Sequence, residues 1–166
     1  FADSTKGWLV TDAAQKSDIG FPSFISASGG TETTVCTNFK VHTFTGPGTF
    51  TVSSVGNSLG SNTIDYLVVA GGGGGGHGQA CFQAGGAGGG GGYRESSGTA
   101  SGAYTVSPLG ACVSALPVTA TGYPVTVGGG GAGAPNSQAP NPGGSSGSNS
   151  VFTGSTTITS AGGGGG

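Results

Sequence analysis

Alternating apolar and polar residues predict short strands in this chain, and three times such a strand runs directly into a block of glycine. The strand at 64–70 precedes glycines 71–76, the strand at 123–127 precedes glycines 128–131, and the strands within 150–161 precede glycines 162–166. Glycine has no side chain to bury and loses the most backbone freedom on folding, so uninterrupted runs indicate that backbones approach each other closely. The repeat therefore points to architecture before chemistry.

A β-hairpin is predicted just before the first of these units. Apolar residues alternate with polar ones through 39–44, a Gly-Pro-Gly turn follows at 46–48, and alternation resumes at 49–52. A second turn at 56–62 leads to the strand at 64–70. These three strands are predicted to form a small antiparallel sheet with one apolar side.

The glycine blocks are predicted to be polyproline II segments. Each glycine costs about 1 kcal/mol relative to alanine in an α-helix, so six in a row exclude that structure. Polyproline II makes no hydrogen bonds within itself, which leaves its backbone groups free to bond to neighbouring segments. The predicted fold class is mainly β, with a small antiparallel sheet that feeds into a glycine-rich, polyproline II-like bundle and no substantial α-helix.

The composition suggests three parts along the 166 residues. Residues 1–30 hold half of the charged residues and the single tryptophan, and they are predicted to be a connector or the end of an upstream module. Residues 31–70 are predicted to be a small β-sheet module. Residues 71–166 form the predicted glycine-rich module with surface loops, and because the chain stops inside a glycine run we expect this module to continue beyond it.

Composition also excludes several classes of protein. Glycine provides 40 residues but does not occupy every third position, which excludes collagen. Only 6% of residues are charged and the net charge is −2, which argues against charge-driven disorder and against a basic surface for nucleic acid. The longest aliphatic stretch, 67–70, is far shorter than the roughly 20 residues that span a bilayer. A neutral, hydroxyl-rich chain suits an extracellular particle.

The motifs that could indicate catalysis or cofactor binding are weak. Any glycine run contains GxGxxG, but no helix can follow 71–76 to face a pyrophosphate. His77 and Cys81 are spaced i and i+4, and Cys36, His42 and Cys112 could complete a zinc site only with irregular spacing. The three cysteines leave open an intrachain disulfide or three separate thiols. We therefore expect no enzyme activity, no cofactor and no metal.

The better candidates for binding are aromatic and polar residues between the glycine blocks. Aromatic faces stack on sugar rings, and amide or guanidinium groups bond to hydroxyls. The structural alternative for Tyr93, which directly follows a glycine run, is that it covers the bundle, and Arg94 and Glu95 could simply pair with each other or with solvent. The candidate receptor-binding residues are His77, Gln79, Phe82, Tyr93, Arg94, Glu95, Tyr104 and Gln138.

Three stretches, at 41–52, 65–71 and 122–128, resemble the glycine-rich modules of tailed-bacteriophage fibres and adhesins, closest to the tail fibres of marine phages, including those of cyanobacteria. The resemblance covers about 28–166. It implies a layered polyproline II bundle whose loops carry recognition. The glycines at 88–92 and 162–166 take the same scaffold role as the principal scaffold glycines, which are Gly71, Gly72, Gly73, Gly74, Gly75, Gly76, Gly128, Gly129, Gly130 and Gly131.

The resemblance also implies a function. It predicts a tail-fibre segment of the virion that has a structural and a receptor-binding role in adsorption to the host-cell surface. The segment is expected to be extracellular and to form a homotrimer, in which the other fibre subunits are further copies. The expected partner is a host-surface glycan or outer-membrane protein, with no membrane insertion. The alternative is a purely structural filament or fibre-shaft subunit that binds no receptor.

Overall fold

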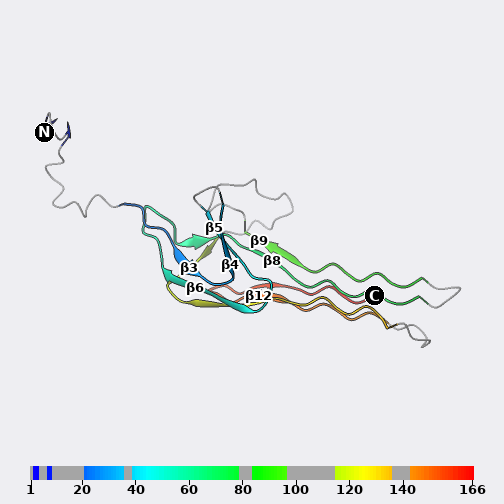
Figure 1. Cartoon of the computed structure of the whole chain (residues 1–166). Coiled ribbons are helices and arrows are strands. Elements are labelled where there is room, and N and C mark those ends of the chain that lie inside the picture. Colours follow the sequence, from blue (N-terminus) through cyan, green and yellow to red (C-terminus); the bar gives the residue numbers. More distant parts are fainter. Residues whose placement is uncertain are drawn as a thin grey trace.

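The computed structural model describes seven stretches of the chain, 2–3, 7–8, 21–35, 39–78, 84–96, 115–135 and 143–166. Strands β3 to β13 gather in one part of the molecule, and extended segments run side by side away from it (Figure 1). Within the described residues the regular elements are all strands, which confirms the predicted mainly-β class. The strands are β1 (Ala2–Asp3), β2 (Gly7–Trp8), β3 (Ser26–Ser28), β4 (Thr31–Val35), β5 (Phe39–Thr43), β6 (Gly48–Ser54), β7 (Thr63–Ile64), β8 (Leu67–Val69), β9 (Tyr93–Glu95), β10 (Leu116–Pro117), β11 (Gly122–Thr126), β12 (Ser150–Phe152) and β13 (Ile158–Ser160).

The largest sheet has five antiparallel strands in the order β13-β12-β11-β6-β3. Strand β6 shows why the sequence folds this way, because Phe50 and Val52 are buried while the residues between and around them are exposed. This period of two gives the strand one apolar face. The described residues also form four two-stranded ribbons, which are β1-β2, β10-β7, β4-β5 and β8-β9.

The core lies on the apolar face of this sheet and is built around three aromatic rings. Tyr123 and Phe152 stack with ring centroids 5.6 Å apart, and Phe50 lies 6.4 Å from the first and 6.3 Å from the second. Val52, Leu116 and Val118 complete the buried cluster. The Tyr123 hydroxyl accepts a hydrogen bond from the Thr119 amide at 2.7 Å, so its polar end is also satisfied.

The predicted hairpin of 39–44 with 49–52 is wrong, and so is the three-stranded sheet built on it. Strand β5 pairs with β4, while β6 pairs with β3 and β11. The predicted strand at 64–70 is divided between β7, which pairs with β10, and β8, which pairs with β9. Pairing β6 with β11 brings Phe50 against Tyr123, and burial of these rings outweighs the short connection to β5.

The five-stranded sheet takes strands from all three predicted parts of the chain, because β3 lies within 1–30, β6 within 31–70 and the other three strands within 71–166. The division of the chain into domains at 30 and 70 stays a prediction.

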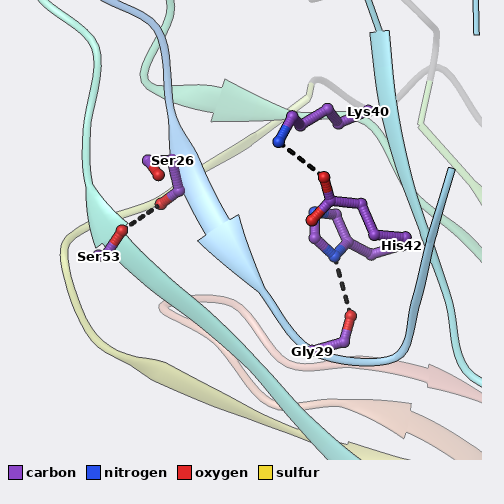
Figure 2. A network of polar contacts seen from close by, with 6 residues as sticks. Ser26, Gly29, Lys40, His42 and Ser53 are labelled. Atoms are coloured by element: carbon purple, nitrogen blue, oxygen red, sulfur yellow. Dashed lines mark hydrogen bonds and ion pairs between the residues drawn. The ribbon is translucent and has the colours of Figure 1, made fainter. Parts of the chain in front are cut away.

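Polar contacts fasten the β4-β5 ribbon to the sheet (Figure 2). The Nδ1 atom of His42, on β5, lies 2.8 Å from the carbonyl oxygen of Gly29. The His42 ring contacts the Phe50 ring edge-on, with ring centroids 5.1 Å apart. Gly29 and Gly30 have φ values of 112° and 63°, a left-handed turn that glycine adopts without steric cost. The turn therefore sets where the ribbon leaves β3.

Across the ribbon, Lys40 Nζ lies 2.6 Å from Glu32 Oε1. The hydrogen bond from Lys40, together with its positive charge, lowers the pKa of Glu32 from the ordinary value. Both side chains are well exposed, so the pair contributes little to stability. That contribution is present above the pKa of Glu32 in the unfolded chain and is lost as pH falls through the lowered pKa of the folded state.

We expect Lys40→Met to raise the pKa of Glu32 towards its ordinary value, because both lowering effects of the ammonium disappear. A side-chain NMR titration of Glu32 measures this, with Lys40→Arg as the variant that keeps the charge. An ordinary pKa for Glu32 in the unmodified chain would contradict the contact.

Candidate functional site: the glycine bundle and the ribbon beside it

Five extended backbone segments form a bundle next to the sheet. We number them I (70–78), II (84–92), III (127–135), IV (143–149) and V (161–166). Segment I continues from β8, segment III follows β11 and segment V follows β13 (Figure 1).

Backbone hydrogen bonds join the segments at intervals of three residues. This is the repeat of a polyproline II helix, which has three residues per turn, so the glycine blocks take the predicted polyproline II-like arrangement. The bonds, written donor to acceptor, are Ala70 to Gly92, Gly73 to Gly89, Gly76 to Gly86, Gly131 to Gly72, Ala134 to Gly75, Gly71 to Ser148, Gly74 to Ser145, Gly163 to Gly71, Gly166 to Gly74, Gly89 to Gly164, Gly92 to Ala161, Ser145 to Ala132, Ser148 to Gly129, Gly147 to Gly163 and Gly144 to Gly166, with N···O distances from 2.6 to 3.1 Å.

Segment I is the centre of the bundle, because it bonds to all four of the others. It runs antiparallel to II and IV and parallel to III and V, as the paired residue numbers show. Segments IV and V also bond to each other, IV bonds to III, and V bonds to II. These hydrogen bonds among the described residues therefore enclose segment I on every side except the one between II and III.

Close approach explains why the runs are glycine. A Cβ at Gly71 would overlap the Gly129 carbonyl oxygen, and a Cβ at Gly74 would overlap that of Ala132. The same overlap recurs three residues apart in the other segments, at Gly85, Gly88 and Gly91, at Gly128 and Gly131, at Gly144 and Gly147, and at Gly162 and Gly165. Of the described glycines only Gly29 and Gly30 have positive φ, so the bundle needs glycine for space and not for an unusual backbone angle.

At the outward positions of the segments, in contrast, a side chain would have room. Added Cβ atoms at Gly90, Gly129 and Gly164 would meet nothing within 4 Å. Three residues from each of these glycines the chain carries an alanine, namely Ala87, Ala132 and Ala161. Segment IV, at 144–149, keeps glycine only at every third position, with exposed serines between. A segment therefore contains more glycine when more of its sides are covered by other segments.

Of the predicted binding residues, Tyr93, Arg94 and Glu95 lie together on β9. This strand pairs with β8, which places Tyr93 opposite Val69 and Glu95 opposite Leu67. The Tyr93 hydroxyl donates to Glu95 Oε2 at 2.6 Å. The other carboxylate oxygen of Glu95, Oε1, is buried and has no hydrogen-bond partner within the part of the chain that the structure describes.

One side of this ribbon is an exposed apolar surface. Leu67 is 60% exposed, Val69 is 52% exposed and Tyr93 is 47% exposed, whereas Val68, which points the other way, packs against the core. We call the three exposed side chains the ribbon patch. Leu67 and Val69 were not among the predicted site residues, because alternation shows that they share a face but not whether a layer covers it.

The structure does not gather the other candidates around the ribbon patch. His77 is half-buried in segment I, eight residues beyond Val69, which is about 25 Å along a polyproline II chain. It therefore lies towards the end of the bundle away from the sheet. Gln79, Phe82, Tyr104 and Gln138 fall outside the described residues, as do Cys36, Cys81 and Cys112.

The described residues contain no cluster of three histidine, cysteine or acidic side chains that could hold a metal ion. A search of the same residues found no helix of the length and apolarity required to cross a membrane.

Comparison with protein families found one match. The family model described as a glycine-rich domain matches residues 43–166, which include β6, the sheet strands after it and the whole bundle. No curated protein and no solved structure matched the chain.

Proposed function

The chain belongs to the glycine-rich domain family, and from this premise we propose that it is a structural and receptor-binding segment of a bacteriophage tail fibre. In this role it is extracellular, part of the virion, and acts in adsorption to the host-cell surface without catalysis. The proposed partner is a host-surface glycan or an outer-membrane protein, and the other fibre subunits are further copies in a homotrimer.

The observation that carries the proposal is the cross-bonded bundle. Its segments bond to each other through the backbone along their length, so the residues at which the segments end are held at fixed places. Segment I ends at Gly78 and segment III at Pro135, both at the end away from the sheet. The candidates Gln79, Phe82 and Gln138 follow these points in the sequence. A rigid support limits the entropy that binding loops lose, which is what an adhesin requires.

The ribbon patch supports a second contact region. A tyrosine ring that is nearly half exposed beside two aliphatic side chains provides a flat apolar face, and Glu95 orients the hydroxyl of that ring. Such a face suits the apolar side of a sugar ring or an apolar protein surface.

The alternative is a purely structural shaft subunit that binds no receptor. The exposed surface supports this alternative too, because the ribbon patch and the small residues of the bundle could equally pack against another subunit. Binding to cells separates the two functions.

We expect the fluorescently labelled chain to adsorb to susceptible cells in a panel of bacteria that includes marine cyanobacteria. Phe82→Ala, Tyr93→Ala and Arg94→Ala test the loop and ribbon residues. A substitution at a residue that contacts the receptor should lower adsorption at least about tenfold, as substitutions of hot-spot residues do. Flow cytometry over a concentration series measures the bound fraction.

Two control variants sharpen this experiment. Tyr93→Phe keeps the ring and removes the hydroxyl bond to Glu95, so it separates stacking from ring orientation. Ser145→Ala changes an exposed side chain of segment IV and should leave adsorption unchanged. Adsorption that no loop or ribbon substitution reduces would leave the shaft subunit as the better function.

A further inference from the structure

The β4-β5 ribbon has one face that carries only uncharged side chains. Directly opposite residues of the two strands share a face, and the faces alternate along each strand. One face, which we call the outer face, consists of Thr31, Thr33, Val35, Phe39, Val41 and Thr43. Val35 is 46% exposed and Val41 is 43% exposed. The three threonines are exposed too, so among the described residues no layer covers this β-branched, largely apolar surface.

The polar face of the ribbon is the one that turns towards the rest of the subunit. Lys40 and His42 extend from the same side of the ribbon (Figure 2). His42 reaches the Gly29 carbonyl oxygen and the Phe50 ring, and Lys40 pairs with Glu32. An antiparallel pair that is solvated on one side usually turns its apolar face to the protein and its polar face to water. Here the order is reversed, which indicates that a further layer covers the outer face.

Both edges of the ribbon are available as well. Strands β4 and β5 bond to each other, and neither has a second neighbouring strand among the described residues. In an antiparallel pair every second residue directs its backbone N–H and C=O away from the partner strand. The β8-β9 ribbon differs, because the Val68 carbonyl oxygen on β8 accepts a hydrogen bond from Ser160 Oγ at 3.0 Å. The β4-β5 ribbon therefore combines an uncovered face with two free edges.

We propose that three copies of this chain join through the β4-β5 ribbon, with β5 of each copy beside β4 of the next. The inference rests on the homotrimer of the proposed function and names the element that holds it together. A threefold ring needs a contact between two different surfaces, since each copy meets its two neighbours through different sides. The two edges of the ribbon meet that requirement. Three two-stranded ribbons then close into a barrel of six strands, which has no free edge.

The strand directions and the side chains agree with this closure. Strands β4 and β5 are antiparallel, so around a threefold axis β5 of one copy is also antiparallel to β4 of the next. The outer faces then meet inside the barrel, while the faces with His42 stay outside, where each is attached to its own subunit. A six-stranded barrel is narrower than an eight-stranded one, which side chains just fill. Valine and threonine suit so narrow an interior.

The surface has the size that a specific assembly needs. Six side chains of roughly 55 Å² each and two edges about 17 Å long and about 5 Å deep bury on the order of 500 Å² per copy. Three copies bury on the order of 1,500 Å², and specific stable interfaces bury about 1,200–2,000 Å² in total. An extended peptide of another protein would add a strand to one edge and leave the other edge free. Three copies therefore fit the ribbon better than such a peptide.

Sedimentation equilibrium of the whole chain from about 5 µM to about 500 µM covers the affinity of an interface of this size. A reducing agent keeps the cysteines from linking chains. We expect the average mass to rise towards three times that of one chain. Val41→Lys should lower the association constant at least about 100-fold, because three ammonium groups would meet inside the barrel. Val55→Lys is the matched control, since it makes the same change at a valine that is 38% exposed and lies outside the ribbon.

Thermal melting at low concentration checks that both variants fold, and both replaced side chains are exposed in a single copy. Amide exchange by NMR gives a second result that does not depend on mass. In a single copy alternate amides of 31–35 and 39–43 face water and should exchange quickly. In the trimer consecutive amides of both strands should be protected, and Val41→Lys should restore the alternation.

A chain that stays monomeric at the highest concentration, or that forms only dimers, would overturn the proposal. A trimer that Val41→Lys leaves intact would overturn it too, but the homotrimer of the proposed function would stand, because the copies would join elsewhere. A trimer that Val41→Lys dissociates and Val55→Lys does not would support the ribbon contact. It would do so even if the unmodified chain failed to adsorb to cells, since adsorption tests the receptor-binding role alone.

Discussion

Replacing Gly74 by alanine is expected to unfold the bundle, whereas the same replacement at Gly72 is expected to leave it intact. At Gly74 the new Cβ would overlap the carbonyl oxygen of Ala132, in a segment that is itself bonded to two others. At Gly72 the nearest atom would be 3.6 Å away. The two positions lie in the same run of six glycines, so composition and local sequence are matched.

The two replacements are expected to change the free energy of unfolding in opposite directions. Overpacking usually costs about 1–3 kcal/mol, and at Gly74 we expect at least about 3 kcal/mol because backbone on every bonded side of segment I resists displacement. Gly74→Val should prevent folding of the bundle altogether. Gly72→Ala should change the free energy of unfolding by about 0.4–1 kcal/mol in the stabilising direction.

Urea denaturation at low protein concentration, where association does not contribute, measures both values. Gly129→Ala provides a second neutral control in another segment. If Gly74→Ala unfolds at the same urea concentration as the unmodified chain, the close approach of segments I and III is wrong.

Replacing Phe50 by alanine is expected to be the most damaging single change in the sheet. The ring is buried and contacts the rings of Tyr123, Phe152 and His42. Removing a buried phenylalanine side chain typically costs about 3–5 kcal/mol, which in a chain of this size lowers the melting temperature by roughly 6–20 °C.

Phe24→Ala is the matched control, because the Phe24 side chain is 67% exposed. It should change stability by no more than about 0.5 kcal/mol. Differential scanning calorimetry of the two variants gives the comparison. Equal melting temperatures for them would contradict the position of the core.

The sheet was predicted only in part, and β5 and β6 show why. Their alternation and the Gly-Pro-Gly turn between them favour a hairpin, and local sequence holds nothing against it. The strands separate because β6 has a better partner in β11, more than 65 residues away in the sequence, where Phe50 meets Tyr123. Local patterns define a strand and its faces, but its neighbour depends on which apolar faces can be buried together.

The candidate site was predicted to a similar extent. Tyr93, Arg94 and Glu95 do lie together, since they are consecutive on one strand. His77 could not be placed relative to them, because a glycine run has no side-chain pattern from which its direction in space can be inferred. Leu67 and Val69 were missed since exposure is a property of what packs above a strand.

The sequence by itself determined that the glycine blocks are not helices and that they serve to bring backbones together. Glycine's missing side chain and its low helix propensity are properties of the residue, so they hold wherever the run is placed. Only the tertiary structure decided which segment is enclosed and which side stays open. Segment I bonds to four neighbours, and Gly74 and Gly72 are identical in sequence terms but differ in what faces them. A residue without a side chain takes its role entirely from the atoms that surround it.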